Sequence, residues 1–211
     1  MAERRLLVDS DVFVLLAASG SLPRVADLLG FSPEQLSRLA ALPHMLRRGK
    51  AFQRKYAHDI RERAITVADA VVAIQERPQN DNVLQLLLSI KGIDEGEALL
   101  FGLLAESSHW WLISGDKTAM RALVGQESLR PVRTLIAGRV ICLESVLKML
   151  VLADGVEAIA GAWLPLKDSY KSLSAIFSEV NCKDQNQCLE CPESMLRDLQ
   201  LALGVDFLLL P

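Results

Sequence analysis

The sequence predicts an α/β fold, in which helices pack on a parallel sheet. Short apolar runs alternate with longer segments of helical periodicity along most of the chain. Hydrophobic residues make up 51% of the 211 residues, which is enough for a sizeable core. No internal repeat or low-complexity tract interrupts this pattern. The length suits one well-filled domain, or one domain with an appendage.

The first predicted elements are a buried strand at residues 5–8 and a helix at 11–18. Residues 32–35, Ser-Pro-Glu-Gln, are typical of a capping box at a helix start. Residues 64–74 fit a helix or a strand, because Ala-Ile-Thr-Val favours a strand and the following alanines favour a helix. We therefore expect a helical insertion at about residues 21–90.

The second half of the chain resumes the alternation of strands and helices. Residues 94–106 predict a helix that is apolar nearly all round and therefore buried. The next predicted elements are a strand at 109–113, a helix at 117–123, a strand at 139–143 and a helix at 144–153. Beyond residue 164 the pattern is helical only. The sequence thus predicts a main domain at residues 1–164 and a helical C-terminal extension at 165–211.

The charge and hydropathy of the chain limit the partners and the cellular compartment that we expect. The formal net charge is −3 and the isoelectric point is near 5.7. A nucleic acid would therefore have to meet a local basic patch, because there is no overall attraction. No apolar run reaches the roughly 20 residues that span a bilayer, and the first residues do not have the pattern of a signal peptide. We expect a cytoplasmic protein without membrane association.

A basic stretch at residues 47–63 lies within the expected insertion, with Phe52 and Tyr56 interleaved. A solvated helix face is the ordinary interpretation of such a stretch. The same charges could also follow a nucleic-acid backbone while the aromatic rings stack on bases. Both interpretations stay open. The candidate nucleic-acid-binding residues are Arg47, Arg48, Arg54 and Lys55.

Three of the four cysteines lie in the C-terminal extension, at Cys182, Cys188 and Cys191. The Cys-x-x-Cys spacing suits zinc, but a fourth ligand is missing and no histidine is near in the sequence. Disulfides are disfavoured in the cytoplasm. We therefore expect free thiols.

Acidic residues stand at three similar places along the chain. Asp9 and Asp11 follow one predicted strand, Asp116 follows another, and Asp94 and Glu97 begin a helix. The carboxyl ends of parallel strands lie along one edge of a sheet, where ligands bind. Asp9 and Asp116 are therefore expected in one cleft, which Glu97 could complete.

Each of these acids also has an ordinary explanation as a helix cap. Asp94 with Glu97 fits a capping box, and Asp11 and Asp116 fit N-caps. Taken together, however, two carboxylates at about 4 Å repel by roughly 4 kcal/mol at an effective dielectric of 20, which a cation would offset. Oxygen ligands without histidine or cysteine suit Mg²⁺ or Mn²⁺. Such an ion can polarise a phosphodiester and activate water.

Four segments carry a resemblance to a known family. In order they are LLVDSDVFVLL, GIDEGEALLFGLLAE, WWLISGDKTAMRAL and GRVICLESVLKML, and they cover roughly residues 5–150. They resemble the ordered motifs of PIN domains, a family of metal-dependent ribonucleases that includes toxins of toxin–antitoxin pairs. The resemblance implies a three-layer α/β/α sandwich around a parallel sheet. The implied site residues are Asp9, Glu97 and Asp116 for catalysis and metal, Asp94 for metal, and Asp11 and Ser114 in support.

The resemblance implies a Mg²⁺- or Mn²⁺-dependent endoribonuclease acting on RNA, which we expect to be single-stranded. It leaves open an antitoxin or other protein partner and a homodimer. The family often has another acid near its second strand, where only Asp69 could stand here. That departure and the extension favour a rival, a catalytically inactive PIN-like scaffold that binds RNA or protein. A metal-dependent phosphatase is a weaker third alternative.

Overall fold

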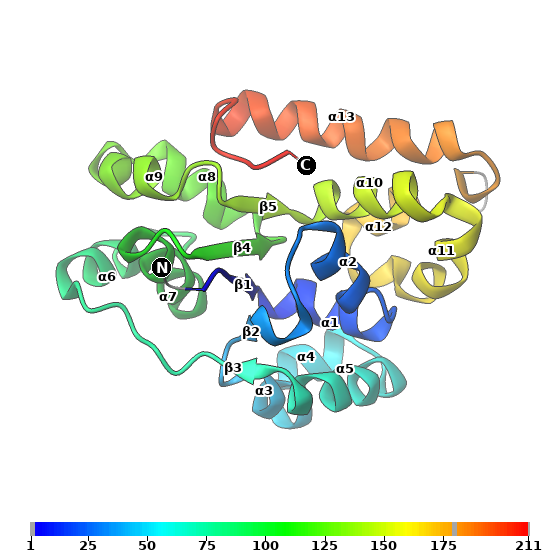
Figure 1. Ribbon diagram of the computed structural model, residues 1–211, viewed down its shortest axis with the longest axis horizontal. Coiled ribbons are helices and arrows are strands. Elements are labelled where there is room, and N and C mark those ends of the chain that lie inside the picture. Colours follow the sequence, from blue (N-terminus) through cyan, green and yellow to red (C-terminus); the bar gives the residue numbers. More distant parts are fainter. Residues whose placement is uncertain (1–2, 179–180, 211) are drawn as a thin grey trace.

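The computed structural model describes residues 3–178 and 181–210 and contains a five-stranded sheet (Figure 1). The strand order is β3-β2-β1-β4-β5, and every neighbouring pair is parallel. The strands are β1 (Arg5–Val8), β2 (Leu36–Arg38), β3 (Val72–Ala73), β4 (Trp110–Ser114) and β5 (Val140–Cys142). The predicted α/β class with a parallel sheet is confirmed.

Helices connect these strands and form the rest of the chain. Those before β4 are α1 (Ser10–Ala18), α2 (Leu22–Leu28), α3 (Leu42–Arg48), α4 (Lys50–Lys55), α5 (His58–Ala70), α6 (Asp81–Leu88) and α7 (Glu95–Glu106). Those after β4 are α8 (Lys117–Gly125), α9 (Arg130–Ile136), α10 (Leu143–Asp154), α11 (Val156–Trp163), α12 (Lys171–Ile176) and α13 (Gln185–Leu203). Short 3-10 turns are η1 (Pro33–Gln35), η2 (Glu127–Leu129), η3 (Leu164–Ser169) and η4 (Asn181–Lys183).

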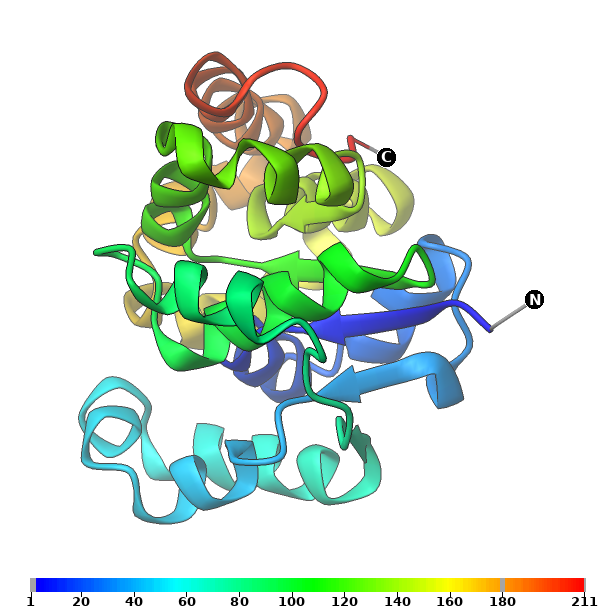
Figure 2. The ribbon, with the colours of Figure 1, turned by 90° about the vertical axis from the view of Figure 1, so that its left-hand side faces the viewer.

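Helices cover both faces of the sheet, because side chains alternate along each strand. In β1, Leu6 and Val8 join a core shared with α1, α2, α5 and α10, whereas Leu7 joins a second core with α7, α8 and α9. Leu6, Leu7 and Val8 are all fully buried. Figure 2 shows α3 to α5 (cyan) at the opposite end of the molecule from α13 (red).

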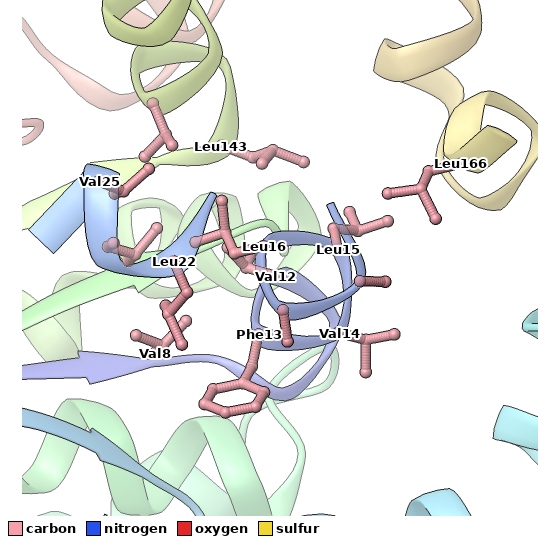
Figure 3. Packing of buried hydrophobic residues seen from close by; sticks show 14 of the residues in the cluster. Val8, Val12, Phe13, Val14, Leu15, Leu16, Leu22, Val25, Leu143 and Leu166 are labelled. Carbon is pink, nitrogen blue, oxygen red and sulfur yellow. The ribbon is translucent and has the colours of Figure 1, made fainter. Parts of the chain in front are cut away.

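Helix α1 is enclosed on all sides, which fixes the position of the residues at its start. The side chains from Val12 to Leu16 are fully buried, and Figure 3 shows them pointing in several directions around the helix, with Leu22 and Leu143 nearby. A helix that is apolar all round is expected in such a place. Asp9 and Asp11 are therefore carried by a rigid element.

The expected helical insertion at residues 21–90 is wrong in one respect, because it contributes two strands to the sheet. The capping box at Ser32 and Gln35 is present, but it begins the turn η1 and then β2. Ser37 and Arg38 are polar yet buried, so β2 has no apolar pattern. The Arg38 guanidinium donates to the carbonyls of Ala68 and Leu39, which allows its burial.

The segment 64–74, which the sequence left open between helix and strand, contains both. Helix α5 runs to Ala70 and β3 follows at Val72. At the start of the C-terminal extension, where the sequence predicted helical structure, the chain forms the 3-10 turn η3 and the helix α12. Within the described ranges, no helix has the length and apolar character needed to cross a membrane.

The C-terminal extension is built into both cores. Helix α13 packs along α10, and Leu199 and Leu203 enter the core that contains Leu7. Leu173 of α12 and Cys188 of α13 are buried in the other core. The extension therefore stabilises the sheet domain directly, and it also reaches the edge of the sheet described next.

Candidate functional site: a cleft at the carboxyl edge of β1 and β4

The carboxyl ends of β1 and β4 lie side by side at the point where the strand order reverses. Strand β1 pairs with β2 on one side and with β4 on the other. The Asp9 N–H donates to the carbonyl of Ile113 at 2.9 Å, which ties the two strand ends together. In open α/β sheets, ligands bind in the crevice at this switch point. Here a cleft of about 1010 Å³ opens, with Asp9, Asp11, Asp94, Glu97 and Asp116 in its lining.

Asp9 occupies the N-cap position of α1, but its side chain makes no capping hydrogen bond. Helix α1 begins at Ser10, so the expectation that Asp11 is the cap is wrong. Burial, then the charge of Asp11 and to a smaller extent that of Asp116, raises the pKa of Asp9 from 3.8 to about 7. Hydrogen bonds from the backbone of Gly115 and Ser10 oppose this shift. The Asp9 carboxylate is therefore not engaged in a cap, and its charge is disfavoured where it stands.

Asp94 and Glu97 form the expected capping box at the start of α7. The Glu97 N–H donates to Asp94 Oδ1 at 2.9 Å, and the Asp94 N–H donates to Glu97 Oε2 at 2.7 Å. Burial raises the pKa of Glu97 from 4.5 to about 8, with further contributions from a hydrogen bond to Asp116 and from the charges of Asp116 and Asp94. Glu97 and Asp116 therefore lie in the same cleft, as was expected from the sequence.

Asp116 has the expected N-cap role at α8 as well as its place in the cleft. Its Oδ1 accepts from the Ala119 N–H at 2.8 Å. Ser114 is buried, and its hydroxyl accepts from the Asp116 N–H at 3.2 Å. Ser114 therefore supports the turn that carries Asp116 and does not line the cleft.

Asp11 is held by two residues from the insertion. Lys55 Nζ lies 2.5 Å from Asp11 Oδ2, and the Tyr56 hydroxyl donates to Asp11 Oδ1 at 2.8 Å. Both oxygens of this carboxylate therefore have partners. Its position among the lining residues agrees with a supporting role beside Asp9.

Of the four basic candidates, only Lys55 lines the cleft. Arg47 forms a 2.5 Å ion pair with Asp69 on the exposed surface, and Arg54 donates to the carbonyl of Lys50. Asp69, the stand-in for a further acid, is therefore engaged away from the cleft. Tyr56 is fully buried and has no face available for stacking, whereas Phe52 lines the cleft.

Several residues that line the cleft were not predicted from the sequence. They are Lys117 and Arg121 of α8, and Tyr170, Lys171 and Ser172 of the C-terminal extension. The Tyr170 hydroxyl donates to the carbonyl of Gly115, beside Asp116. Lys117 directly follows Asp116, and this adjacency was a usable signal. Nothing in the sequence pairs Tyr170 with a turn 55 residues earlier.

The donors present are of the kind that Mg²⁺ and Mn²⁺ prefer, namely the carboxylates of Asp9, Glu97 and Asp116. In the parts of the chain that the structure describes, no three acidic, histidine or cysteine side chains form a ready metal-binding group. Burial is the main cause of the raised pKa values of Asp9 and Glu97, and the negative charges of the neighbouring acids add to it. The chemistry of the donor set fits a hard divalent ion.

The three cysteines of the C-terminal extension, Cys182, Cys188 and Cys191, are free thiols. Cys188 is fully buried, and burial together with Cys182 and Cys191 raises its pKa to about 11. A thiol with such a pKa is a poor nucleophile at neutral pH.

Comparison with family models, with curated proteins and with solved structures gives no match for this chain. The functional interpretation therefore rests on the site itself.

Proposed function

We propose that this chain is a metal-dependent endoribonuclease of the PIN type, which hydrolyses phosphodiester bonds in single-stranded RNA. The observation that carries the proposal is the convergence of Asp9, Glu97 and Asp116 on one cleft at the carboxyl edge of β1 and β4. These residues come from three segments that are far apart in the sequence. Their gathering is what a cation site would require.

The fold supports the proposal at a coarser level. A parallel sheet with helices on both faces is the architecture that the PIN resemblance implies. The motifs also occur in the expected structural places, since Asp9 follows β1, Glu97 lies in the first turn of α7 and Asp116 follows β4. This agreement concerns the scaffold, so the activity needs its own test.

Each acid has a distinct role in the proposal. Asp9, Glu97 and Asp116 would hold Mg²⁺ or Mn²⁺, and Asp94 orients Glu97 through the capping box. A bound ion supplies an activated water and offsets charge on the leaving oxygen. Asp11, fixed by Lys55 and Tyr56, keeps negative charge next to Asp9.

A second candidate function is an RNA-binding module without catalysis. It is favoured by the hydrogen bonds that the acids already make. Glu97 Oε2 and Asp116 Oδ1 serve as helix caps, and both oxygens of Asp11 are paired. A scaffold could retain Glu97, Asp116 and Asp11 for these structural reasons alone.

Melting curves in chelator and in Mn²⁺ test the proposal together with a cleavage assay on single-stranded RNA. We expect Mn²⁺ at 100 times its dissociation constant to stabilise the wild type by about 2.7 kcal/mol. Asp9→Asn and Asp116→Asn should lose most of this stabilisation and most of the cleavage. Asp206→Asn, an exposed acid outside the cleft, is the matched control.

Two outcomes contradict a shared metal site. Equal stabilisation by Mn²⁺ in the wild type and in both cleft variants would refute it. Stabilisation of none of the proteins, with RNA bound but not cleaved, would establish the binding module instead.

A further inference from the structure

Glu144 is a fully buried carboxylate that lies behind the cleft. It is in the first turn of α10, directly after β5, and its side chain is 0% exposed. Lys117 Nζ lies 2.5 Å from its Oε1, and the Ser172 hydroxyl donates to the same oxygen. Lys117 Nζ also donates to Ser172 Oγ at 3.0 Å. Among the described residues, Glu144 Oε2 has no hydrogen-bond partner.

Stability alone gives little reason for this arrangement. Removing a carboxylate from water is costly, and a buried ion pair can often be replaced by apolar side chains without loss of stability. The neighbouring side chains of Leu143, Val146 and Leu147 are fully buried and apolar, so an apolar residue would suit the site. The presence of the carboxylate is therefore better explained by the side chain that it holds in position.

Glu144 holds the side chain of Lys117, which reaches the cleft. Lys117 directly follows Asp116, its side chain is 24% exposed, and it lines the cleft. Two of its three N–H donors are accounted for by Glu144 and Ser172, which leaves one for a ligand. Arg121, four residues further along α8, also lines the cleft and lies on the same face of the helix.

A serine–lysine nucleophile is not supported by this geometry. The Ser172 hydroxyl donates its proton to Glu144, and Lys117 is paired with the same carboxylate. Lys117 is thus engaged as a hydrogen-bond donor, and Ser172 links it to the C-terminal extension.

We propose that Lys117 binds a phosphate oxygen of a polynucleotide in the cleft, and that Glu144 and Ser172 are the residues that position it. This inference rests on the proposed function, since it assigns the phosphate-holding residue of that same cleft. It also gives the C-terminal extension a part in the site, because Ser172 belongs to the extension.

The test is binding of fluorescently labelled single-stranded RNA, followed by anisotropy over a range of KCl, in EDTA and in Ca²⁺. Lys117→Met/Glu144→Gln removes both charges and so leaves no unpaired buried ion. We expect about tenfold weaker binding and a salt slope that is smaller by about 0.7. Lys148→Met/Glu193→Gln is the matched control, because this 2.9 Å pair between α10 and α13 lies outside the cleft.

Two further variants separate charge from position. Lys117→Arg keeps the charge and should keep the wild-type salt slope. Ser172→Ala leaves the charge in place but removes one anchor, so we expect about threefold weaker binding with an unchanged slope. Circular dichroism melting checks that each variant is folded.

Three results overturn the inference: wild-type affinity and slope in the folded double variant, an equal loss in the Lys148/Glu193 control, or no RNA binding by the wild type in either buffer. Its failure is distinguishable from failure of the proposed function. If Mn²⁺-dependent cleavage persists in the double variant with an unchanged KM, the role of Lys117 is refuted and the proposed function is not. If the wild type cleaves nothing but the double variant binds RNA less tightly, Lys117 remains the phosphate-binding residue of a binding module.

Discussion

The Tyr56 hydroxyl donates a 2.8 Å hydrogen bond to Asp11 Oδ1, which joins the start of α1 to a residue 45 positions later. Tyr56 is 1% exposed, and burial together with the charge of Asp11 raises its pKa well above the usual range. The phenol therefore stays protonated and remains a donor. Through this bond and the Lys55 ion pair, the insertion forms one wall of the cleft.

Tyr56→Phe removes this donor and keeps the packing of the ring. We expect the free energy of unfolding to fall by about 2 kcal/mol, because the acceptor is a carboxylate. Urea denaturation measures the change. A double-mutant cycle with Asp11→Asn supplies the control, and a loss of equal size in the Asp11→Asn background would show that the hydrogen bond is not its cause.

Stability in chelator should depend on pH through Asp9 and Glu97. Their folded pKa values of about 7 and about 8 lie above the ordinary values of 3.8 and 4.5. Between these limits the folded chain keeps protons that the unfolded chain releases, so a rise in pH favours unfolding. We expect the free energy of unfolding to decrease from about pH 4 to about pH 8. Asp9→Asn should flatten this decrease, and an unchanged slope would contradict the raised pKa of Asp9.

Gly115→Ala tests how closely the C-terminal extension packs on the turn before Asp116. A Cβ at this position would lie 3.1 Å from Tyr170 Oη and 3.1 Å from Val12 Cγ2. We expect a loss of about 1–3 kcal/mol in the free energy of unfolding. Tyr170→Phe removes the hydroxyl oxygen, so the same substitution should cost less in that background. The prediction fails if the two backgrounds respond alike.

The exposed arginines of the insertion are tested separately from Lys55. If Arg47, Arg48 and Arg54 contact RNA phosphates, their joint replacement by glutamine should lower the salt slope by about 0.7 for each contact. Arg77→Gln/Arg130→Gln/Arg197→Gln, which removes three charges outside the cleft, controls for the loss of net charge. Anisotropy titrations over KCl measure both slopes, and an unchanged slope in the triple variant would assign these arginines to solvated surface.

The tail cysteines should be dispensable as metal ligands. Cys182→Ser and Cys191→Ser replace half-buried thiols and are expected to change stability little. Cys188→Ser places a hydroxyl in a fully buried position, so we expect a loss of about 1–3 kcal/mol. Denaturation and zinc analysis of the purified protein check this. Stoichiometric zinc that is released in Cys188→Ser, with loss of the fold, would show a structural zinc site.

Much of the fold was predictable, because its central elements have strong local signals. The run Leu6-Leu7-Val8 reads as a buried strand, and the capping box of Asp94 and Glu97 marks the start of α7. Strand β2 was not predictable from its own residues. Arg38 can be buried because its guanidinium donates to the carbonyl of Ala68, 30 residues further along the chain, and a sequence pattern does not contain this tertiary information.

The candidate site follows the same division. Asp9 and Asp116 could be placed in one cleft because the ends of parallel strands share an edge. The partners Tyr170 and Ser172 come from the extension, and their contacts with Gly115 and Lys117 depend on how that extension packs. Glu144 lies in the segment GRVICLESVLKML, but the sequence suggests no role for it, since its burial beside Lys117 is visible only in three dimensions.

The contact between the C-terminal extension and the cleft has a consequence for the timing of synthesis. The ribosome delivers Asp9 first and Asp116 more than a hundred residues later, and the residues that complete the cleft wall, Tyr170 and Ser172, follow last. While Tyr170 and Ser172 are still inside the ribosome, Gly115 and Lys117 lack the hydrogen-bond partners that these two residues provide. The cleft can therefore reach its final shape only after most of the chain has left the ribosome.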